Sequence, residues 1–138
     1  MHASIDDQKL ISLPILGDAR GSLCVIESGR DIGFPIARVY YIFDTKPGVS
    51  RGFHAHLALN QLAVCVRGSC TMVLDDGRQR RDFRLDRPDR GLTIGPMIWR
   101  EMHDFSDDAV LMVLADRHHD EADYIRDYDT FLARVHAA

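Results

Sequence analysis

The sequence predicts one all-β domain, a sandwich or barrel of short antiparallel strands, that ends in a single α-helix. Short runs of β-forming residues recur at intervals of roughly 8 to 12 residues over residues 9–116, which is typical of these folds. Turn residues separate the runs, as at Asp76-Gly77, a pair that favours a tight hairpin. The last segment differs, because its apolar residues have the spacing that indicates a helix.

Nine segments have the composition of strands. In chain order they are residues 9–14, 22–27, 37–44, 52–56, 61–67, 69–75, 79–86, 91–105 and 109–116. The runs 61–67 and 109–116 are almost continuously apolar, as expected for strands that are covered on both faces. The runs 69–75 and 79–86 alternate between apolar and polar residues, as expected for strands with one face toward solvent. Two packed sheets would account for both patterns.

The helix is predicted over residues 120–135, with the sequence DEADYIRDYDTFLARV. An acidic first turn precedes apolar residues that recur at three- and four-residue intervals, which is the pattern of an amphipathic helix. These residues are Tyr124, Ile125, Tyr128, Phe131, Leu132 and Val135. We expect the helix to pack on the outside of the barrel or on a partner.

Length, charge and cysteine content limit the class of protein. The chain has 138 residues, which fits a single domain over residues 1–138. Its formal net charge is −4 and its arginines are scattered, which argues against a nucleic-acid partner. We expect no membrane partner and a cytoplasmic location, because the sequence lacks a long apolar run and a secretory signal. Cys24, Cys65 and Cys70 form no CxxC pair and are predicted to be reduced thiols in or near the core.

The segment RGFHAHLALNQ, residues 51–61, is the main candidate for a functional site. In an extended strand His54 and His56 point to the same face, so their imidazoles are expected to be neighbours. Two clustered imidazoles beside Arg51 are more typical of a site than of a core. Imidazole can take and give a proton near neutral pH, which points to general acid–base catalysis. Arg51 would lower the pKa of a nearby histidine and bind an anionic part of a substrate.

A metal site is the alternative interpretation of the same residues. Small β-barrels of the cupin type commonly carry an HxH pair, a glutamate a few residues later and a further histidine on a later strand. Here Gln61 takes the place of the glutamate, and Glu101 that of the later histidine. Two imidazoles and a neutral amide bind a divalent cation poorly, although Glu101 could restore a site of two histidines and one carboxylate. Proton transfer without a metal is therefore the first hypothesis and a metal site the second.

Five strings in order along the chain resemble one enzyme family. They are RVYYIFDT, RGFHAH, LDDG, GPMIWREMHDFS and DYIRDYDTF, and the likeness extends over about residues 18–131. Together they resemble the TDP-4-keto-6-deoxyglucose 3,4-ketoisomerases of nucleotide-sugar biosynthesis. The resemblance implies a cupin-like jelly roll (a double-stranded β-helix), no metal or other cofactor, and a homodimer that exchanges an N-terminal β segment.

The resemblance also implies a reaction. A ketone moves from C4 to C3 of a TDP-linked 4-keto-6-deoxyhexose, on the way to 3-amino-3,6-dideoxy sugars for cell-surface glycans or natural products. The shift needs a base at C3, a proton donor at C4 and groups that stabilise the enediolate oxygens. By resemblance, His54 and His56 carry the protons, with no assignment of which one acts at C3. Tyr40 is the next catalytic candidate, as a hydrogen-bond donor or proton relay.

Further residues are expected to bind the substrate. Arg51 is expected to hold the pyrophosphate through charge-assisted hydrogen bonds, and Gln61 to donate to a sugar oxygen or to a histidine. Trp99 is a candidate for stacking on thymine or sugar, with a place in the core as the alternative. Glu101 is a candidate for orienting a histidine through the second ring N–H of that histidine.

Arg20 and Arg100 occupy positions at which the family varies. By resemblance, Arg20 is typical of the subgroup with a galacto-configured product, whereas Arg100 is typical of the subgroup with a gluco-configured product. The configuration at C4 therefore stays open, as do the final sugar and the nucleotide specificity. Two other classes also stay open, namely a metal-dependent cupin enzyme and a non-catalytic module that binds sugar nucleotides. The nearest enzymatic alternative is the deoxysugar 3,5-epimerase, which exchanges protons at C3 and C5 without moving the ketone.

Overall fold

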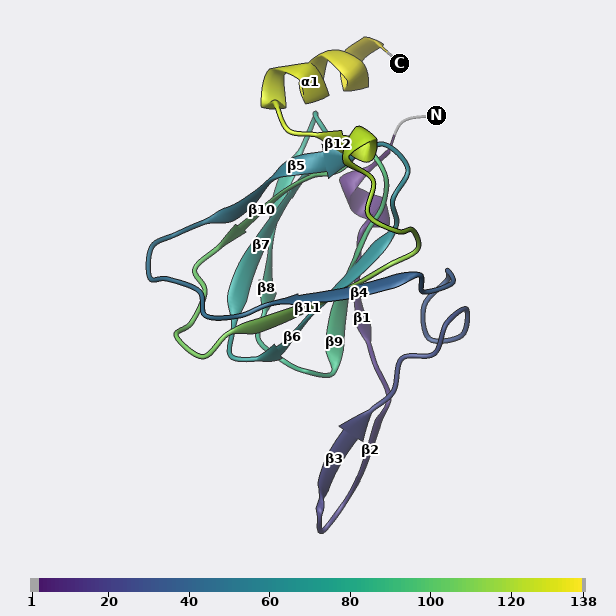
Figure 1. Ribbon diagram of the computed structural model, residues 1–138, viewed down its shortest axis with the longest axis vertical. Coiled ribbons are helices and arrows are strands. Elements are labelled where there is room, and N and C mark those ends of the chain that lie inside the picture. Colours follow the sequence, from purple (N-terminus) through teal and green to yellow (C-terminus); the bar gives the residue numbers. More distant parts are fainter. Residues whose placement is uncertain (1–2, 138) are drawn as a thin grey trace.

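The structure is a computed structural model and describes residues 3–137. Two five-stranded antiparallel sheets pack against each other and form the body of the molecule (Figure 1). In spatial order the first sheet contains β1 (Leu10–Ser12), β9 (Arg90–Ile94), β6 (Gln61–Arg67), β11 (Val110–Ala115) and β4 (Arg38–Ile42). The second sheet contains β12 (Tyr124–Ile125), β5 (Arg51–His56), β10 (Trp99–His103), β7 (Cys70–Asp75) and β8 (Arg80–Leu85). The predicted all-β, cupin-like jelly roll is confirmed.

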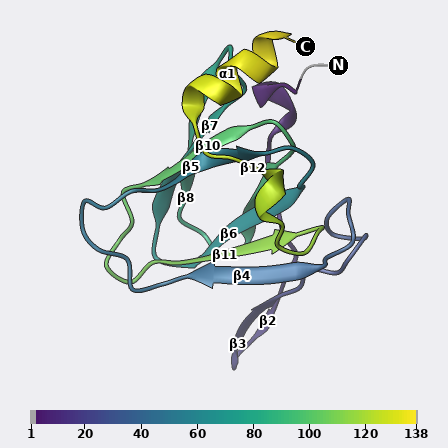
Figure 2. The same ribbon diagram turned by 45° about the horizontal axis from the view of Figure 1, so that its top comes forward.

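The remaining elements lie outside the two sheets. The hairpin of β2 (Ile15–Asp18) and β3 (Gly21–Cys24) projects from the body, at the bottom of Figure 1. Two short 3₁₀ turns, η1 (Ile5–Asp7) and η2 (Glu121–Asp123), precede β1 and β12. Among the described residues one α-helix is present, α1 (Tyr128–Ala137), and it lies across the outer face of the second sheet (Figure 2). No helix among residues 3–137 has the length and apolar character needed to cross a membrane.

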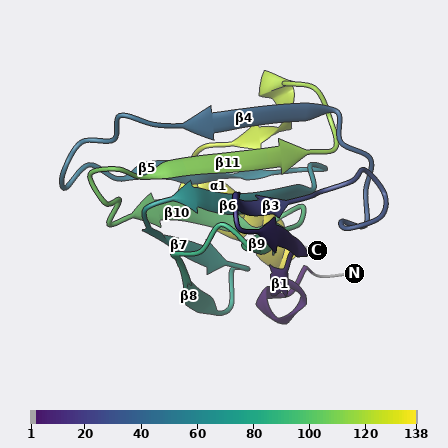
Figure 3. The same ribbon diagram turned by 90° about the horizontal axis from the view of Figure 1, so that it is seen from below.

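The core lies between the two sheets and is built from alternate residues of their inner strands. It includes Ala63, Cys65, Met72, Leu74, Met102, Leu111 and Val113, all at most 3% exposed. The strand β6 is buried on both faces, as its continuous apolar run predicts, because Leu62 and Val64 pack in a second cluster with Leu13 and Ile32. The strand β4 lies at the edge of its sheet beside β11, as Figure 3 shows.

Two predicted elements divide differently in the structure. The predicted strand 91–105 is two strands, β9 and β10, which belong to different sheets. Pro96 and Met97, whose φ is +58°, interrupt the extended backbone between them. The sequence prediction also missed β2, and Cys24, predicted to be in or near the core, is exposed.

The predicted helix 120–135 starts later than its apolar spacing indicated. Residues 121–123 form η2, and Tyr124 and Ile125 pair with His56 and Ala55 of β5. The helix begins after Asp127, whose carboxylate accepts a hydrogen bond from the backbone N–H of Thr130 at 2.9 Å and so caps the first turn. Pairing with a distant strand therefore overrides the local helical pattern and places residues 123–126 beside the histidines.

Candidate active site

A cavity of about 390 Å³ lies where the edge strand β4 faces β5. Its walls come from β4, β5, β10 and the segment 119–126 before α1. The polar side chains that line it are His54, His119, Tyr40, Tyr124, Arg38, Arg51 and Arg126. Two larger hollows, of about 490 and 540 Å³, lie along the β2–β3 hairpin and beside residues 31–34, and no imidazole lines either of them.

A β-bulge in β5 brings Arg51 and His54 to the same cavity. Residues three apart face opposite sides of a regular strand, but the pairing of β5 with β10 shifts register between Arg100 and Glu101. Gly52, at φ +90°, lies so close to β10 that an added Cβ would be 3.1 Å from the carbonyl oxygen of Arg100. Position 52 therefore requires glycine, because the backbone conformation that directs Arg51 and His54 to the cavity leaves no room for a Cβ.

The two imidazoles are neighbours, as the alternation predicts. Their ring centroids are 5.0 Å apart and the rings are nearly perpendicular, at 88°. Tyr124 packs against both rings, with centroid distances of 5.1 Å to His54 and 4.3 Å to His56. His54 lines the cavity, whereas His56 is only 1% exposed and its Nδ1 lies 3.0 Å from Oδ2 of Asp123.

Both histidines are neutral at physiological pH. Burial, together with the charge of Arg100, lowers the pKa of His54 to about 4. Burial lowers the pKa of His56 to about 2, and Arg100 acts in the same direction. The sequence prediction gave Arg51 as the charge that lowers the histidine pKa. Arg51 is exposed, whereas Arg100 is fully buried on β10 directly opposite His54.

Acidification is expected to destabilise the fold between about pH 6.5 and pH 4. Unfolded histidine titrates near 6.5, and the pKa values of His54 and His56 are lower in the folded protein. Below pH 6.5 the unfolded chain binds protons that the folded protein does not, so the free energy of unfolding falls as the pH decreases. One unit of pKa difference corresponds to about 1.4 kcal/mol. We therefore expect the free energy of unfolding to fall by at least about 2 kcal/mol over this pH range. Urea denaturation at pH 7, 6, 5 and 4 measures it; a His54→Asn variant should show a smaller decrease, and an identical decrease would contradict the assignment.

Tyr40 is held by a buried polar chain. Its hydroxyl oxygen accepts a hydrogen bond from Nε2 of Gln61 at 3.2 Å, and Oε1 of Gln61 in turn accepts one from the guanidinium of Arg100. Burial raises the pKa of Tyr40, so its phenol stays protonated and can donate into the cavity. Gln61 was predicted to donate to a sugar oxygen or to a histidine, and Arg100 to bind the substrate. Each is 1% exposed, neither lines this cavity, and together they support Tyr40 from behind.

Arginines give the cavity a positive wall. Nε of Arg38 is buried without a hydrogen-bond partner in the described chain, and its guanidinium lies 5.6 Å from the centre of the Tyr40 ring. Arg126 lies over the ring of Tyr124 at 4.1 Å. The sequence prediction included Arg51 but missed Arg38 and Arg126. Arg38 could have been found from its place two residues before Tyr40, since both then share one face of β4.

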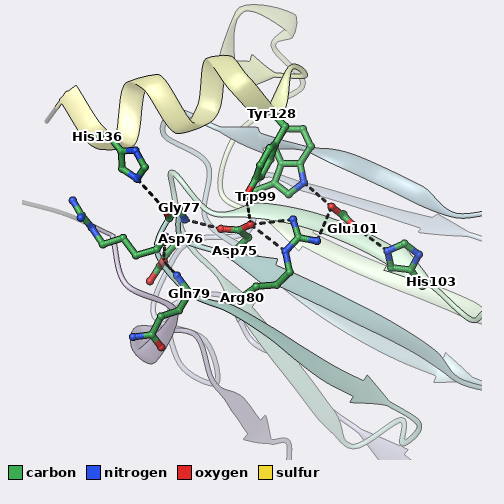
Figure 4. Close-up of polar contacts among 11 residues, drawn as sticks. Asp75, Asp76, Gly77, Gln79, Arg80, Trp99, Glu101, His103, Tyr128 and His136 are labelled. Carbon is green, nitrogen blue, oxygen red and sulfur yellow. Dashed lines mark hydrogen bonds and ion pairs between the residues drawn. The ribbon is translucent and has the colours of Figure 1, made fainter.

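Two predicted residues on β10 lie away from the cavity. On β10, Trp99 and Glu101 alternate with Arg100 and therefore face outward, where Trp99 packs on α1 and donates a hydrogen bond to Glu101 at 3.0 Å (Figure 4). Glu101 bonds His103 at 2.9 Å, not His54 or His56, so the site of two histidines and one carboxylate is not assembled. Among residues 3–137 no group of three or more His, Cys, Asp or Glu side chains is placed to hold a metal ion.

Arg20 is also remote from the cavity. It lies at the tip of the β2–β3 hairpin, where its side chain is 90% exposed and pairs with Asp18. The sequence prediction also missed Asp123 and Tyr124, because the segment that carries them was assigned to a helix. Their contact with the histidines depends on pairing between β12 and β5, which are far apart in the sequence.

The chain combines a cupin-type jelly roll with a cavity lined by imidazoles, phenols and arginines. Residues 6–136 match the family model described as FdtA: WxcM-like, C-terminal. The curated TDP-4-oxo-6-deoxy-alpha-D-glucose-3,4-oxoisomerase of Aneurinibacillus thermoaerophilus is 54% identical over 125 residues, which cover 91% of this chain and 90% of that protein. The chain belongs to the TDP-sugar 3,4-ketoisomerase family.

Solved structures agree with this assignment. A 3,4-ketoisomerase from Helicobacter canadensis superposes with a TM-score of 0.92 at 48% identity, covering 94% of this chain and 98% of that one. QdtA, a sugar 3,4-ketoisomerase from Thermoanaerobacterium thermosaccharolyticum solved in complex with TDP, superposes with a TM-score of 0.94 at 39% identity, covering 97% and 98%. A variant of QdtA with a histidine replaced by asparagine was solved with TDP-4-keto-6-deoxyglucose.

Proposed function

We propose that this protein converts TDP-4-keto-6-deoxy-D-glucose to a TDP-3-keto-6-deoxyhexose by histidine-mediated proton transfer through an enediolate. Membership of the 3,4-ketoisomerase family supports the reaction. The observation that supports the chemistry is the neutral imidazole of His54 on the wall of a cavity that also presents the Tyr40 phenol and several arginines. A neutral imidazole can accept a proton, a phenol can donate a hydrogen bond to a developing oxyanion, and arginines can bind phosphate.

His54 is proposed as the base that acts at C3. It lines the cavity, whereas His56 is 1% exposed and packed behind Tyr124. His54 takes the C3 proton, the C3–H electron pair forms a double bond to C4, and the former carbonyl oxygen becomes the enediolate oxygen. The proton of the C3 hydroxyl then passes to the C4 oxygen, the C3 oxygen becomes the new carbonyl, and the His54 imidazolium, whose proton exchanges with solvent, returns a proton to C4. Tyr40 stabilises the enediolate by hydrogen bonding, and Gln61 and Arg100 hold its hydroxyl in place.

The arginines on the cavity wall are proposed to bind the diphosphate. Arg51 is exposed at the mouth, and Arg38 and Arg126 lie on β4 and on the segment opposite it. Guanidinium groups form charge-assisted bonds with phosphate oxygens, and the unpartnered Nε of Arg38 leaves a buried donor for such a bond. This extends the sequence prediction, which gave that role to Arg51 alone.

A homodimer is proposed in which the β2–β3 hairpin packs on a second copy of the chain. The hairpin exposes Ile15, Leu16 and Leu23 by 49–60%, and β4 exposes Val39 and Tyr41 by 52% and 63%. Both are apolar surfaces at the margins of the molecule, of the kind that subunit contacts cover. Arg20, which makes no contact with the cavity of its own chain, would then be free to approach that of its partner. Sedimentation equilibrium distinguishes this dimer from a monomer.

The cellular role is proposed from the product. A 3-ketosugar nucleotide has the carbonyl that an amino-transfer reaction needs to make a 3-amino-3,6-dideoxy sugar, for lipopolysaccharide or another glycan. We place this step in the cytoplasm, with no nucleic-acid or membrane partner. The net charge of −4 is in keeping with the absence of a nucleic-acid partner.

Metal-stripped protein is expected to convert TDP-4-keto-6-deoxyglucose to a 3-ketosugar at the rate of untreated protein. The physical reason is that the proposed reaction uses an imidazole and a phenol of the chain for proton transfer. Product formation after chelation and gel filtration, followed by NMR, measures it. Activity that is lost and then restored by a divalent cation would favour the metal-dependent cupin enzyme. Tight binding of TDP without conversion would favour the non-catalytic binding module.

A further inference from the structure

We propose that Asp123 is a positioning residue of the histidine pair: its carboxylate fixes the tautomer and orientation of His56, and His56 with Tyr124 sets the ring of His54. This inference rests on the proposed function, because it assigns His54 the role of base. It concerns a residue that the sequence prediction placed in a helix, and that reaches the site through the pairing of β12 with β5.

Asp123 is fixed to the end of β5 by three hydrogen bonds. Its Oδ1 accepts from the backbone N–H of Ala58 at 2.9 Å, its carbonyl oxygen accepts from the N–H of Leu57 at 2.9 Å, and its Oδ2 lies 3.0 Å from Nδ1 of His56. The side chains of His56 and Asp123 are 2% and 14% exposed. Because His56 is neutral and a carboxylate can only accept, the hydrogen of His56 must lie on Nδ1, which leaves Nε2 without one.

The orientation of His54 depends on this arrangement. Nδ1 of His54 is buried and has no hydrogen-bond partner among the residues that the structure describes. Besides a backbone contact with Gly52, its ring is held by packing, edge to face against His56 and at 5.1 Å from Tyr124. If His56 turns, the support beneath His54 is lost. Asp123 thus acts on the base through one intermediate ring.

The C-terminal helix holds the segment that carries Asp123. The hydroxyl of Tyr128, at the start of α1, donates to Asp75 of β7 at 2.6 Å, and the Tyr128 ring packs edge-on against Trp99 at 5.1 Å (Figure 4). Arg80 bridges Asp75 and Glu101, at 3.0 and 3.2 Å. The backbone on both sides of Asp123 is therefore fixed, on one side by β5 and on the other by α1 docked on the second sheet.

An Asp123→Asn substitution tests the proposal. The asparagine has the same shape, but its NH₂ group can donate to Nδ1 of His56, which favours the other tautomer, with hydrogen on Nε2. We expect kcat to fall by about 10-fold or more, with KM and TDP affinity within about twofold of wild type. Long-range ¹H–¹⁵N NMR of histidine-labelled protein should show hydrogen on Nδ1 of His56 in the wild type and on Nε2 in the variant. The matched control is Asp127→Asn, which makes the same change on the same segment, touches neither imidazole, and should alter neither kcat nor the spectrum.

The outcomes separate this inference from the proposed function. An unchanged kcat in folded Asp123→Asn, or a wild-type His56 with hydrogen on Nε2, would overturn the role of Asp123. A wild-type protein that shows the Nδ1 tautomer but has no isomerase activity would overturn the proposed function and leave the contact intact. If Asp123→Asn folds poorly, the wild-type spectrum still decides the tautomer, and Asp123→Glu, which keeps the acceptor, should retain more activity than the asparagine variant.

Discussion

Replacing His54 with asparagine is expected to lower kcat by about 10²- to 10⁴-fold, the contribution typical of a general base. Asparagine is nearly as large and polar but cannot accept a proton from carbon near neutral pH. Because the arginines that we assign to the diphosphate are untouched, the affinity for TDP should change little. Steady-state turnover of TDP-4-keto-6-deoxyglucose and TDP titration calorimetry measure the two effects.

A second histidine variant supplies the control for this result. His118 is exposed and does not line the cavity, so His118→Asn should keep kcat within about twofold of wild type. If His54→Asn retained more than about a tenth of wild-type kcat, another group would have to remove the C3 proton.

Replacing Phe131 with alanine is expected to destabilise the protein by about 3 to 5 kcal/mol. Phe131 is fully buried under α1, in a cluster with Ala55, Trp99 and Ile125. Removing its ring leaves a cavity between the helix and the second sheet and loses the contacts that dock α1. The midpoint of urea denaturation should fall with the slope unchanged.

The exposed residue Arg134, on the same helix, is the matched control. Arg134→Ala should change the free energy of unfolding by no more than about 0.5 kcal/mol. A loss below about 1 kcal/mol for Phe131→Ala would mean that α1 contributes little to the fold. Docking of α1 on the second sheet would then not be what holds Asp123 and Tyr124 in place.

Local periodicity predicted the parts of the site that lie on single strands. Alternation placed His54 beside His56, and the same rule relates Arg38 to Tyr40 on β4. Alternation along a strand could not show which of its two faces points toward the residues of a neighbouring strand. Trp99 was a candidate for stacking on the substrate, with the core as the alternative, and Glu101 was a candidate for orienting a histidine of the site. No pattern within β10 reveals which alternate residues face His54, because a bulge opposite Arg100 fixes that register.

The segment 120–127 shows how non-local pairing limits such predictions. Tyr124 and Ile125 have helical spacing with Tyr128, yet their backbone pairs with β5, and the helix starts only after the cap at Asp127. Asp123 was invisible as a site residue for the same reason. Likewise Arg100 and Gln61 carry opposite ends of one buried hydrogen bond, although 39 positions separate them in the chain.

The location of solvent deuterium in the product tests the central claim most directly. Wild-type protein and TDP-4-keto-6-deoxyglucose are incubated in D₂O, and the sugar nucleotide is examined by ¹H and ¹³C NMR. Proton transfer by His54 predicts a ketone at C3, loss of the original C3 hydrogen and deuterium at C4, with C5 unlabelled. A ketone that stays at C4 while deuterium enters at C5, as in a 3,5-epimerase, would contradict the account.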